Sequence, residues 1–288
     1  MSELDTLERH PWNTSFEWQP HDGPHRQLTD AQANQFDELG FVVVEDAVDP
    51  PTLARVTAEI DAFEAELETS LRTQADDRIF IAEADAITFT THLVARSEEI
   101  RRLATSAVFV NLCSDLVGPD VNMYWDQAVY KKPEKPRRFP WHQDNGYTFI
   151  EPQQYLTCWV ALTDVDESNG CPWVVPGTHR LGTLRHWMTD LGWRCLERAD
   201  NAVAVPARAG SIIVFSSLTP HRTGPNRTSE VRKAYIVQFA PDGARLAPSG
   251  SGAASMCDDP VLQFPILVDG DPPEARTPLS ANPPNFKS

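Results

Sequence analysis

The residues best suited to chemistry lie in the stretch FPWHQDNGYTF, residues 139–149, where an imidazole and a carboxylate stand two positions apart. Residues i and i+2 of a β-strand point to the same face, so the side chains of His142 and Asp144 would converge there. Of the eight histidines, only His142 has an aspartate two residues later. The pair alone does not define a metal site, because a histidine at a strand end beside a solvated aspartate also arises by chance. A third ligand has to come from elsewhere in the chain.

The candidate for the third ligand is His221. An apolar strand, residues 211–217, follows the Ala209–Gly210 turn, and His221 lies just beyond the exit of this strand. In a barrel of antiparallel strands, the ends of two distant segments can meet at one mouth. Two imidazoles and one carboxylate then form a facial triad with open coordination positions. This triad is typical of non-haem Fe(II) oxygenases, and zinc is the alternative ion.

Two further residues in the same region indicate a carboxylate pocket. Arg232 lies eleven residues after His221 on the following predicted strand, and Thr223 lies two residues after it. A guanidinium can hold a carboxylate through two parallel hydrogen bonds, and a threonine hydroxyl can donate a third. The pair therefore suggests a pocket for a dicarboxylate cosubstrate. Taken singly, Arg232 also fits an exposed strand charge and Thr223 a turn residue.

The elements that must position these residues change character along the chain. Helices are expected over residues 29–40, 49–72 and 97–118, with a strand over 41–48, so the first 118 residues should be mainly helical. After Gly118 the chain consists of short runs rich in β-branched and aromatic residues, separated by turn-forming clusters. These runs are residues 122–133, 141–150, 155–165, 171–179, 202–217 and 232–241. The pattern predicts a β-sandwich or barrel, and without βαβ units or a glycine-rich phosphate-binding motif a nucleotide-binding fold is disfavoured.

Length and composition limit the class of protein. The 288 residues carry a net charge of −16, from 41 acidic and 25 basic side chains, which would repel nucleic acids and anionic membranes. The sequence shows no signal peptide and no apolar run of membrane-spanning length, so we expect a cytoplasmic location. Five cysteines without a C-x-x-C spacing are expected to be buried thiols. One domain over residues 1–288 is expected, with a proline-rich tail, residues 241–288, that wraps the surface or is partly disordered.

Taken together, the His-x-Asp pair, the distal histidine and the arginine eleven positions beyond it form a specific pattern. The sequence resembles the phytanoyl-CoA dioxygenase (PhyH) family, within the Fe(II)/2-oxoglutarate-dependent oxygenases. The resemblance covers about residues 28–240, and it is carried by QAVYKKP, WHQDNGY, CWVALTDVDESNGCPWVVPGTHR and PHRTGPNRTSEVRKAYIVQF. It implies a mainly β fold with flanking helices, a double-stranded β-helix, which is a jelly-roll or cupin-like barrel buttressed by the amino-terminal helices.

The resemblance also implies a role for each site residue. The catalytic Fe(II) ligands would be His142, Asp144 and His221. Arg232 and Thr223 would bind the distal carboxylate of the cosubstrate 2-oxoglutarate. Trp159 would lie close to the cosubstrate, although Trp159 also fits a barrel core, and Gln127 would contact it through its polar side chain. Reaction with O2 would give succinate, CO2 and a hydroxylated product. Halogenation is disfavoured, because related halogenases lack the carboxylate ligand.

Other conspicuous residues have structural interpretations beside functional ones. The triad is complete without His179, so a hydrogen-bonding role is expected for it. Four more aromatic side chains could line the substrate cavity or simply pack, namely His92, His186, Trp173 and Trp187. The basic cluster KKPEKPRR, residues 131–138, could attract an anionic substrate, and a solvated loop is the simpler interpretation.

The substrate stays open at this point. Family members act on acyl-CoA thioesters, amino acids, compatible solutes and secondary metabolites. The acidic composition argues against a polyanionic CoA ester, and a small molecule such as a natural-product intermediate is favoured. Two alternatives from other classes are a zinc-dependent hydrolase or isomerase on a cupin-like barrel and a non-catalytic binding barrel. Desaturation, epimerisation or cyclisation would need the same iron and cosubstrate, and neither this choice nor the oligomeric state follows from the sequence.

Overall fold

The computed structural model describes residues 7–247 and 254–274. The first helix, α1 (Asp30–Leu39), begins with a capping box in which Thr29 and Gln32 each bind the other's backbone N–H, and it ends at Gly40, whose φ is 82°. These are the start and stop signals expected from the sequence. Strand β1 (Phe41–Val44) follows directly.

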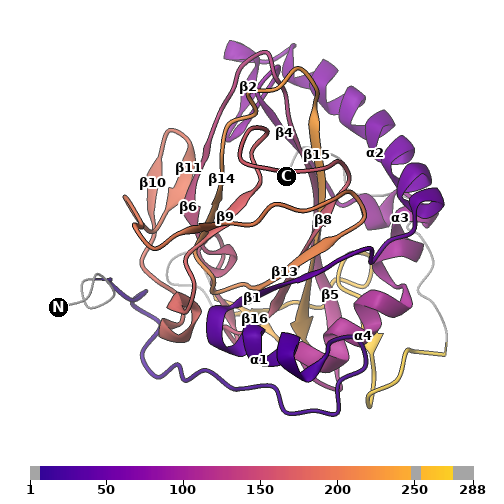
Figure 1. Cartoon of the computed structure of the whole chain (residues 1–288), viewed down its shortest axis with the longest axis vertical. Coiled ribbons are helices and arrows are strands. Elements are labelled where there is room, and N and C mark those ends of the chain that lie inside the picture. The colour runs from indigo at the N-terminus through magenta and orange to yellow at the C-terminus, as the bar shows by residue number, and fades with distance from the viewer. Residues whose placement is uncertain (1–6, 248–253, 275–288) are drawn as a thin grey trace.

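The long helix α2 (Pro50–Leu71) lies along the outside of the main sheet (Figure 1). Asp49 caps its first turn by accepting a hydrogen bond from the backbone N–H of Thr52 at 2.9 Å, and prolines open the helix. Its buried residues recur at helical spacing and pack toward β4; they are Val56, Ile60, Glu64, Leu67 and Leu71.

Two details of the amino-terminal region correct the sequence interpretation. The chain between α2 and residue 96 has no α-helix, because it forms β2 (Arg78–Ile79), β3 (Ala82–Glu83) and β4 (Ile87–Thr91), with a short 3-10 turn before β2 and another after β4. The helix expected over residues 97–118 is two helices, α3 (Glu98–Ala104) and α4 (Ala107–Leu116). The hydroxyl of Thr105 donates back to the carbonyl of Arg101 at 3.0 Å, a local bond that competes with helix continuation.

Nine antiparallel strands form the large sheet. Eight of them follow the order β1-β13-β8-β15-β5-β4-β3-β2, and the ninth, β18, pairs with Val121 and Asn122 at the start of β5. Each strand at its centre comes from one of the β-rich runs in the sequence. These strands are β5 (Val121–Lys131), β8 (Leu156–Ala161), β13 (Ile212–Ser216) and β15 (Arg232–Pro241).

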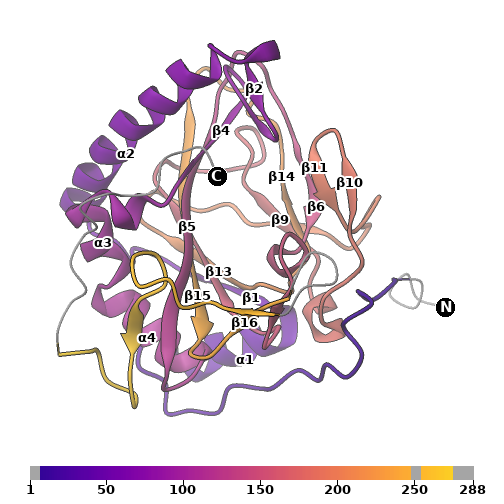
Figure 2. The same ribbon diagram turned by 180° about the vertical axis from the view of Figure 1, so that it is seen from behind.

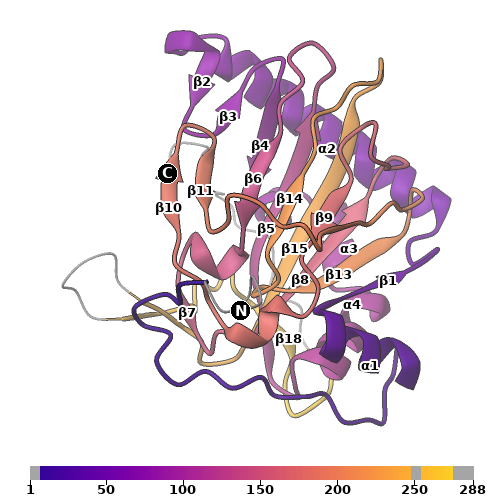
Figure 3. The ribbon, with the colours of Figure 1, turned by 60° about the vertical axis from the view of Figure 1, so that its left-hand side comes forward.

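A smaller sheet of four strands faces the large one, in the order β12-β9-β14-β6 (Figure 3). Its strands are β6 (Phe139–His142), β9 (Pro172–Val174), β12 (Val203–Ala204) and β14 (His221–Thr223). Two antiparallel sheets packed face to face, with helices on the outer side of the larger one, form the double-stranded β-helix that the sequence predicted. The remaining strands form two small sheets; they are β10 (Trp187–Thr189) with β11 (Gly192–Arg194), and β7 (Ile150–Glu151) with β16 (Arg245–Leu246) and β17 (Ser255–Met256).

Side chains alternate along β8, β13 and β15 of the large sheet, and this alternation separates two cores. On β8, Cys158 and Val160 pack with the residues of the helices, whereas Trp159 and Ala161 point between the two sheets. On β15, Tyr235 joins the helix side and Ala234 joins the inner side. Residues in phase with Ala234 therefore face the interior of the barrel, where a site between the sheets would lie.

The carboxyl-terminal segment is more integrated than expected. Strand β18 (Pro265–Leu267) pairs with β5 and lies beside α4, as the yellow strand in Figure 2. Phe264 and Ile266 are buried in the core on the helix side. The expectation of a surface tail is therefore wrong for this part, because its apolar residues bury against the sheet. Residues 248–253 and 275–288 of the tail lie outside the described residues.

Two bulk expectations can be compared with the structure. The five cysteines are all free and buried, as predicted. Within the part of the chain that the structure describes, no helix is both long and apolar enough to cross a membrane.

Candidate metal centre and cosubstrate pocket

The two histidines of the candidate triad are cross-strand neighbours. Strands β6 and β14 pair antiparallel, with His142 directly opposite His221, and the centroids of the two rings are 4.1 Å apart. Both side chains are buried. The pairing of short strands from distant parts of the chain thus places the two imidazoles at one point between the sheets.

Asp144 reaches this point by a turn. Strand β6 ends at His142, and Asp144 begins the 3-10 turn Asp144–Gly146, so the strand alternation assumed from the sequence is wrong for this residue. The turn still brings the carboxylate Oδ1 to 3.8 Å from Nε2 of His142 and to 3.8 Å from Nε2 of His221. One ligand atom from each of the three residues lies within 4.8 Å of the others, a spacing that fits a single metal ion.

Backbone carbonyls orient both imidazoles. The Nδ1–H of His142 donates to the carbonyl of Pro140 at 2.9 Å, and the Nδ1–H of His221 donates to the carbonyl of Thr219 at 3.0 Å. These bonds select the tautomer whose Nε2 lone pair faces Asp144. Burial, followed by the neighbouring imidazole of His221, holds the pKa of His142 well below its usual value, so this ligand stays neutral.

The carboxylate of Asp144 is also fixed in direction. Its Oδ2 accepts a hydrogen bond from the hydroxyl of Thr157 at 2.6 Å, which leaves Oδ1 facing the histidines. Thr157 in turn accepts from the side chain of Gln238 at 3.3 Å. The sequence analysis missed both residues, although Thr157 lies in phase with Trp159 on a predicted strand and was therefore identifiable as inward-facing.

The residue between the two sequential ligands anchors the metal-binding turn. The fully buried Gln143 donates to the carbonyl of Leu218 at 2.6 Å and accepts from the backbone N–H of Leu184 at 2.6 Å. Its own backbone N–H donates to Nε2 of His186 at 3.0 Å. His186 therefore packs behind the turn, and it does not line the substrate cavity.

Gly146 leaves the room that this imidazole occupies. A Cβ at Gly146 would overlap the ring of His186. The variant Gly146→Ala should displace His186 and the turn, and we expect metal affinity to fall about 10- to 100-fold, as for other groups that orient metal ligands. Metal titration of the variant measures this directly. The double variant Gly146→Ala/His186→Ala should bind metal as well as His186→Ala alone, because the new Cβ then has no ring to overlap. If the losses of metal affinity in the two single variants added fully in the double variant, the overlap would be contradicted.

His179 has the structural role expected for it. The Nε2–H of its fully buried ring donates to the carbonyl of Asp37 at 3.1 Å, and the ring packs edge-on against Trp18. Among the described residues, the group that could hold a metal ion consists of His142, Asp144 and His221 and does not include His179. Burial lowers the pKa of His179 to about 4, and the pKa of His186 likewise to about 4. Both are therefore neutral in the folded protein at neutral pH.

These two histidines should make the fold acid-sensitive. Between their ordinary pKa of 6.5 and about 4, the unfolded chain binds protons that the folded protein excludes. The free energy of unfolding should therefore fall as the pH drops through this window, by about 2 kcal/mol per histidine between pH 7 and pH 5. Urea unfolding of the metal-free protein measures the fall, and His179→Gln should reduce it. An unchanged pH dependence in His179→Gln would show that His179 does not contribute.

The buried Arg232 lies on the inner face of β15, in phase with Ala234 and Ile236. Only 1% of its surface is exposed, and its Nη1 donates to the carbonyl of Val129 at 3.1 Å. Its Nε and Nη2 have no partner among the described residues. Burial lowers the pKa of Arg232 to about 9, and its guanidinium carbon lies 5.4 Å from the centroid of the Trp159 ring. A buried cation with two free donors fits an anionic carboxylate.

Lys131 lies directly opposite Arg232 on β5 and is also buried. Its ammonium group donates to the backbone carbonyls of Thr223, at 3.3 Å, and Gly224, at 2.5 Å. The solvated-loop interpretation of the basic cluster is therefore wrong for Lys131, which holds the chain just after β14. Thr223 shares the strand face of His221, two residues away, so its hydroxyl side chain lies on the triad side of the small sheet.

A cavity of about 500 Å³ opens beside the triad. Gln127 lines it together with His142 and Asp144, whereas Trp159, Thr223 and Arg232 do not. Three of the aromatic residues considered for the cavity are likewise absent from its wall, namely His92, Trp173 and Trp187. His92 instead packs against Trp125, with ring centroids 4.6 Å apart.

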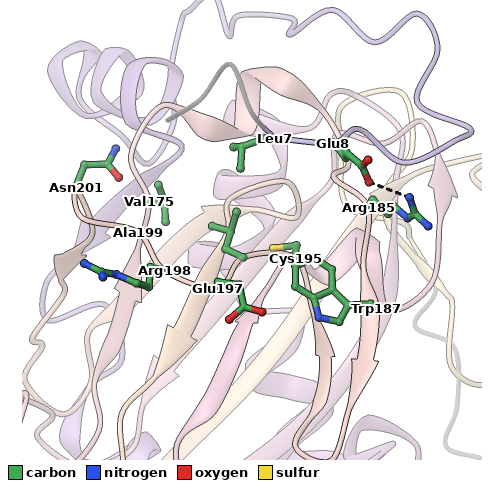
Figure 4. Close-up of a pocket in the computed structure, with 11 residues that line it drawn as sticks. Leu7, Glu8, Val175, Arg185, Trp187, Cys195, Glu197, Arg198, Ala199 and Asn201 are labelled. Carbon is green, nitrogen blue, oxygen red and sulfur yellow. Dashed lines mark hydrogen bonds and ion pairs between the residues drawn. The ribbon is translucent and has the colours of Figure 1, made fainter. Parts of the chain in front are cut away.

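A second hollow, of about 410 Å³, lies away from the triad (Figure 4). The exposed ion pair of Arg185 with Glu8 crosses one side of it. Cys195 is the one cysteine that lines it, and burial raises the pKa of that thiol far above its usual value. A protonated thiol is a poor nucleophile, so Cys195 is not suited to catalysis.

The fold and the site together define a class. A double-stranded β-helix with a buried His–Asp–His triad between its sheets is the architecture of non-haem iron oxygenases. The model of the Phytanoyl-CoA dioxygenase (PhyH) family matches residues 36–234. The chain therefore belongs to the phytanoyl-CoA dioxygenase family, which confirms the resemblance seen in the sequence.

Individual relatives agree with this assignment. A phytanoyl-CoA dioxygenase of Arabidopsis thaliana is 27% identical over 168 residues, covering 56% of this chain and 59% of the relative. The peroxisomal phytanoyl-CoA dioxygenase of Homo sapiens is 25% identical over 231 residues, covering 74% of this chain and 68% of the relative. The chain thus spans between about three fifths and two thirds of their length.

Solved structures share the fold. The epimerase SnoN, crystallised with Fe3+, alpha ketoglutarate and nogalamycin RO, superposes with a TM-score of 0.61 at 23% identity, covering 78% of this chain and 91% of SnoN. The carbocyclase SnoK from nogalamycin biosynthesis gives a TM-score of 0.63 at 21% identity, covering 88% of this chain and 98% of SnoK.

Proposed function

We propose that this protein is an Fe(II)- and 2-oxoglutarate-dependent dioxygenase that hydroxylates a C–H bond of a small organic molecule and releases succinate and CO2. The observation that carries the proposal is Arg232, a buried cation with two unpaired donors on the inner face of the barrel that holds the triad. A dicarboxylate cosubstrate would satisfy both donors. Zinc hydrolysis on the same barrel would require no such residue.

Each residue has a specific task in this proposal. His142 and His221 offer their Nε2 atoms and Asp144 its Oδ1, and three protein ligands leave open coordination positions for the 2-keto acid and O2. Bound iron, with 2-oxoglutarate and O2, supplies the oxidising power for breaking a C–H bond.

The chain's own groups hold and orient the reactants. We assign Arg232 and Thr223 to the distal carboxylate of 2-oxoglutarate and Trp159 to the wall beneath the guanidinium, 5.4 Å from it. Gln127 is assigned a polar contact; it lines the cavity with His142 and Asp144, which supports a contact on the substrate side. The burial of His142 and His221 shields their side of the metal site from water.

Composition supports the proposal on partners. The net charge of −16 favours a small-molecule substrate over nucleic acid, and we propose a cytoplasmic protein with a single catalytic domain. SnoN was crystallised with nogalamycin RO and SnoK comes from nogalamycin biosynthesis, which supports a natural-product intermediate as the substrate of this protein.

Cosubstrate turnover tests the proposal. The protein reconstituted with Fe(II) should consume O2 and 2-oxoglutarate and form succinate in equal amounts, slowly without substrate and faster with it. The same protein loaded with zinc should form no succinate. Hydrolytic activity with zinc that does not depend on 2-oxoglutarate would contradict the oxygenase assignment and favour the hydrolase.

A further inference from the structure

The wall of the cavity beside the triad carries no charge of its own. Among the described residues that line it there is no lysine, arginine or glutamate, and the one aspartate is the ligand Asp144. Two arginines lie near the hairpin that borders it, and neither is among the residues that line the cavity. Arg78 donates to the carbonyl of Phe80 at 2.6 Å. Arg137 pairs with Glu83 through Nη1 at 3.0 Å, while its Nε and Nη2 have no partner among the described residues.

Aromatic rings make up much of this wall. They include pairs in contact, such as Phe89 with Phe139 at 5.6 Å and Tyr124 with Tyr155 at 5.5 Å between centroids. Trp193 closes another side from the β10–β11 hairpin. Faces and edges of aromatic rings pack well against other ring systems, at centroid distances of about 4.5–7 Å.

Apart from the metal ligand Asp144, the polar groups of the wall are neutral. The amides of Gln127 and Gln238 and the hydroxyl of Thr91 line the cavity. Burial raises the pKa of Tyr124 far above its usual value, so its hydroxyl remains a neutral donor. Neutral donors and acceptors suit the hydroxyl, keto or ether oxygens of a substrate.

A charged substrate would lose its hydration here without gaining an ion-pair partner among the residues that line the cavity, other than the metal ligand Asp144. The cosubstrate pocket differs, because there Arg232 has two unpaired donors, Nε and Nη2, for a carboxylate. We propose that the substrate is an uncharged, ring-bearing molecule with hydroxyl or keto groups, and that anionic molecules such as CoA thioesters are excluded. This inference rests on the proposed function, because it concerns the same site.

A matched pair of probes tests it. 2-Acetylnaphthalene and 2-naphthoate have nearly the same shape and differ in charge, and 2-undecanone is a neutral ketone without a ring. Calorimetric titration into the anaerobic protein with Fe(II) and 2-oxoglutarate should give at least about tenfold tighter binding of 2-acetylnaphthalene than of either comparison. Equal or tighter binding of 2-naphthoate would overturn the exclusion of anions, and equal binding of 2-undecanone would overturn the requirement for a ring.

Two tryptophans of the same hairpin provide the control. Trp193 lines the cavity, whereas Trp187 is 38% exposed and does not. Trp193→Ala should weaken binding of 2-acetylnaphthalene about tenfold and Trp187→Ala should leave it unchanged. An unchanged affinity in Trp193→Ala would place the probe outside the cavity and contradict the inference. The absorption of the iron–2-oxoglutarate chelate is recorded before the probe is added, and the metal-free protein is titrated in parallel. A missing chelate band would be a failure of the proposed function, whereas a band with the wrong order of probe affinities would be a failure of this inference alone.

Discussion

The variant Asp144→Ala should lose measurable turnover and bind Fe(II) at least about a hundredfold more weakly than the parent protein. The reason is that Asp144 is the one anionic group of the triad, with Oδ1 at 3.8 Å from both imidazoles. Anaerobic titration with Fe(II), followed by equilibrium dialysis, measures the affinity.

Thr157→Val is the matched comparison for this variant. It keeps all three ligands and removes only the hydroxyl that donates to Oδ2 of Asp144 at 2.6 Å. We expect a smaller loss of metal affinity, about tenfold, because the carboxylate can then rotate. Metal affinity in Asp144→Ala equal to that of the parent would show that the ion, if bound, sits elsewhere.

The variant Arg232→Leu should raise the dissociation constant for 2-oxoglutarate about a hundredfold while metal affinity stays within about twofold of the parent. Its guanidinium is the buried cation with free donors on the inner face, and leucine cannot replace a charged hydrogen bond. Titration of 2-oxoglutarate into the protein loaded with Fe(II), in the absence of O2, gives the constant.

Lys233 provides the control for this experiment. It is the next residue on β15, so its side chain points to the other face, where it forms an ion pair with Asp61 at 2.7 Å. Lys233→Met should leave 2-oxoglutarate binding unchanged. Equal weakening in both variants would mean that general charge, and not the position of Arg232, governs the affinity.

The sequence was informative where a residue type was rare and its spacing specific. His142 was selected because Asp144 follows it two residues later, and His221 because it lies just beyond the exit of a predicted strand. Strands β6 and β14 bring the two histidines directly opposite each other. Arg232 was placed on a strand that the structure shows as β15. The fold class followed from the β-rich runs after Gly118, since each main strand contains one run of β-branched and aromatic residues.

The sequence was uninformative where a long-range contact decides the conformation. Asp144 lies in a 3-10 turn and not on a strand, because the turn is fixed by contacts of Gln143 and His186 with distant loops. Likewise, strands β2 and β3 are two residues each, too short for any periodic pattern, and form only by pairing with each other and with β4. Strand β18 lies in a proline-rich tail, and its pairing with β5 is equally non-local.

The most direct test of the central claim is the visible spectrum of the protein mixed anaerobically with Fe(II) and 2-oxoglutarate. If His142, Asp144 and His221 hold the iron and Arg232 positions the dicarboxylate, a weak metal-to-ligand charge-transfer band should appear, vanish in His142→Ala, and require more 2-oxoglutarate in Arg232→Leu. A protein that binds Fe(II) but shows no band at saturating 2-oxoglutarate, or an identical band in His142→Ala, would contradict the account.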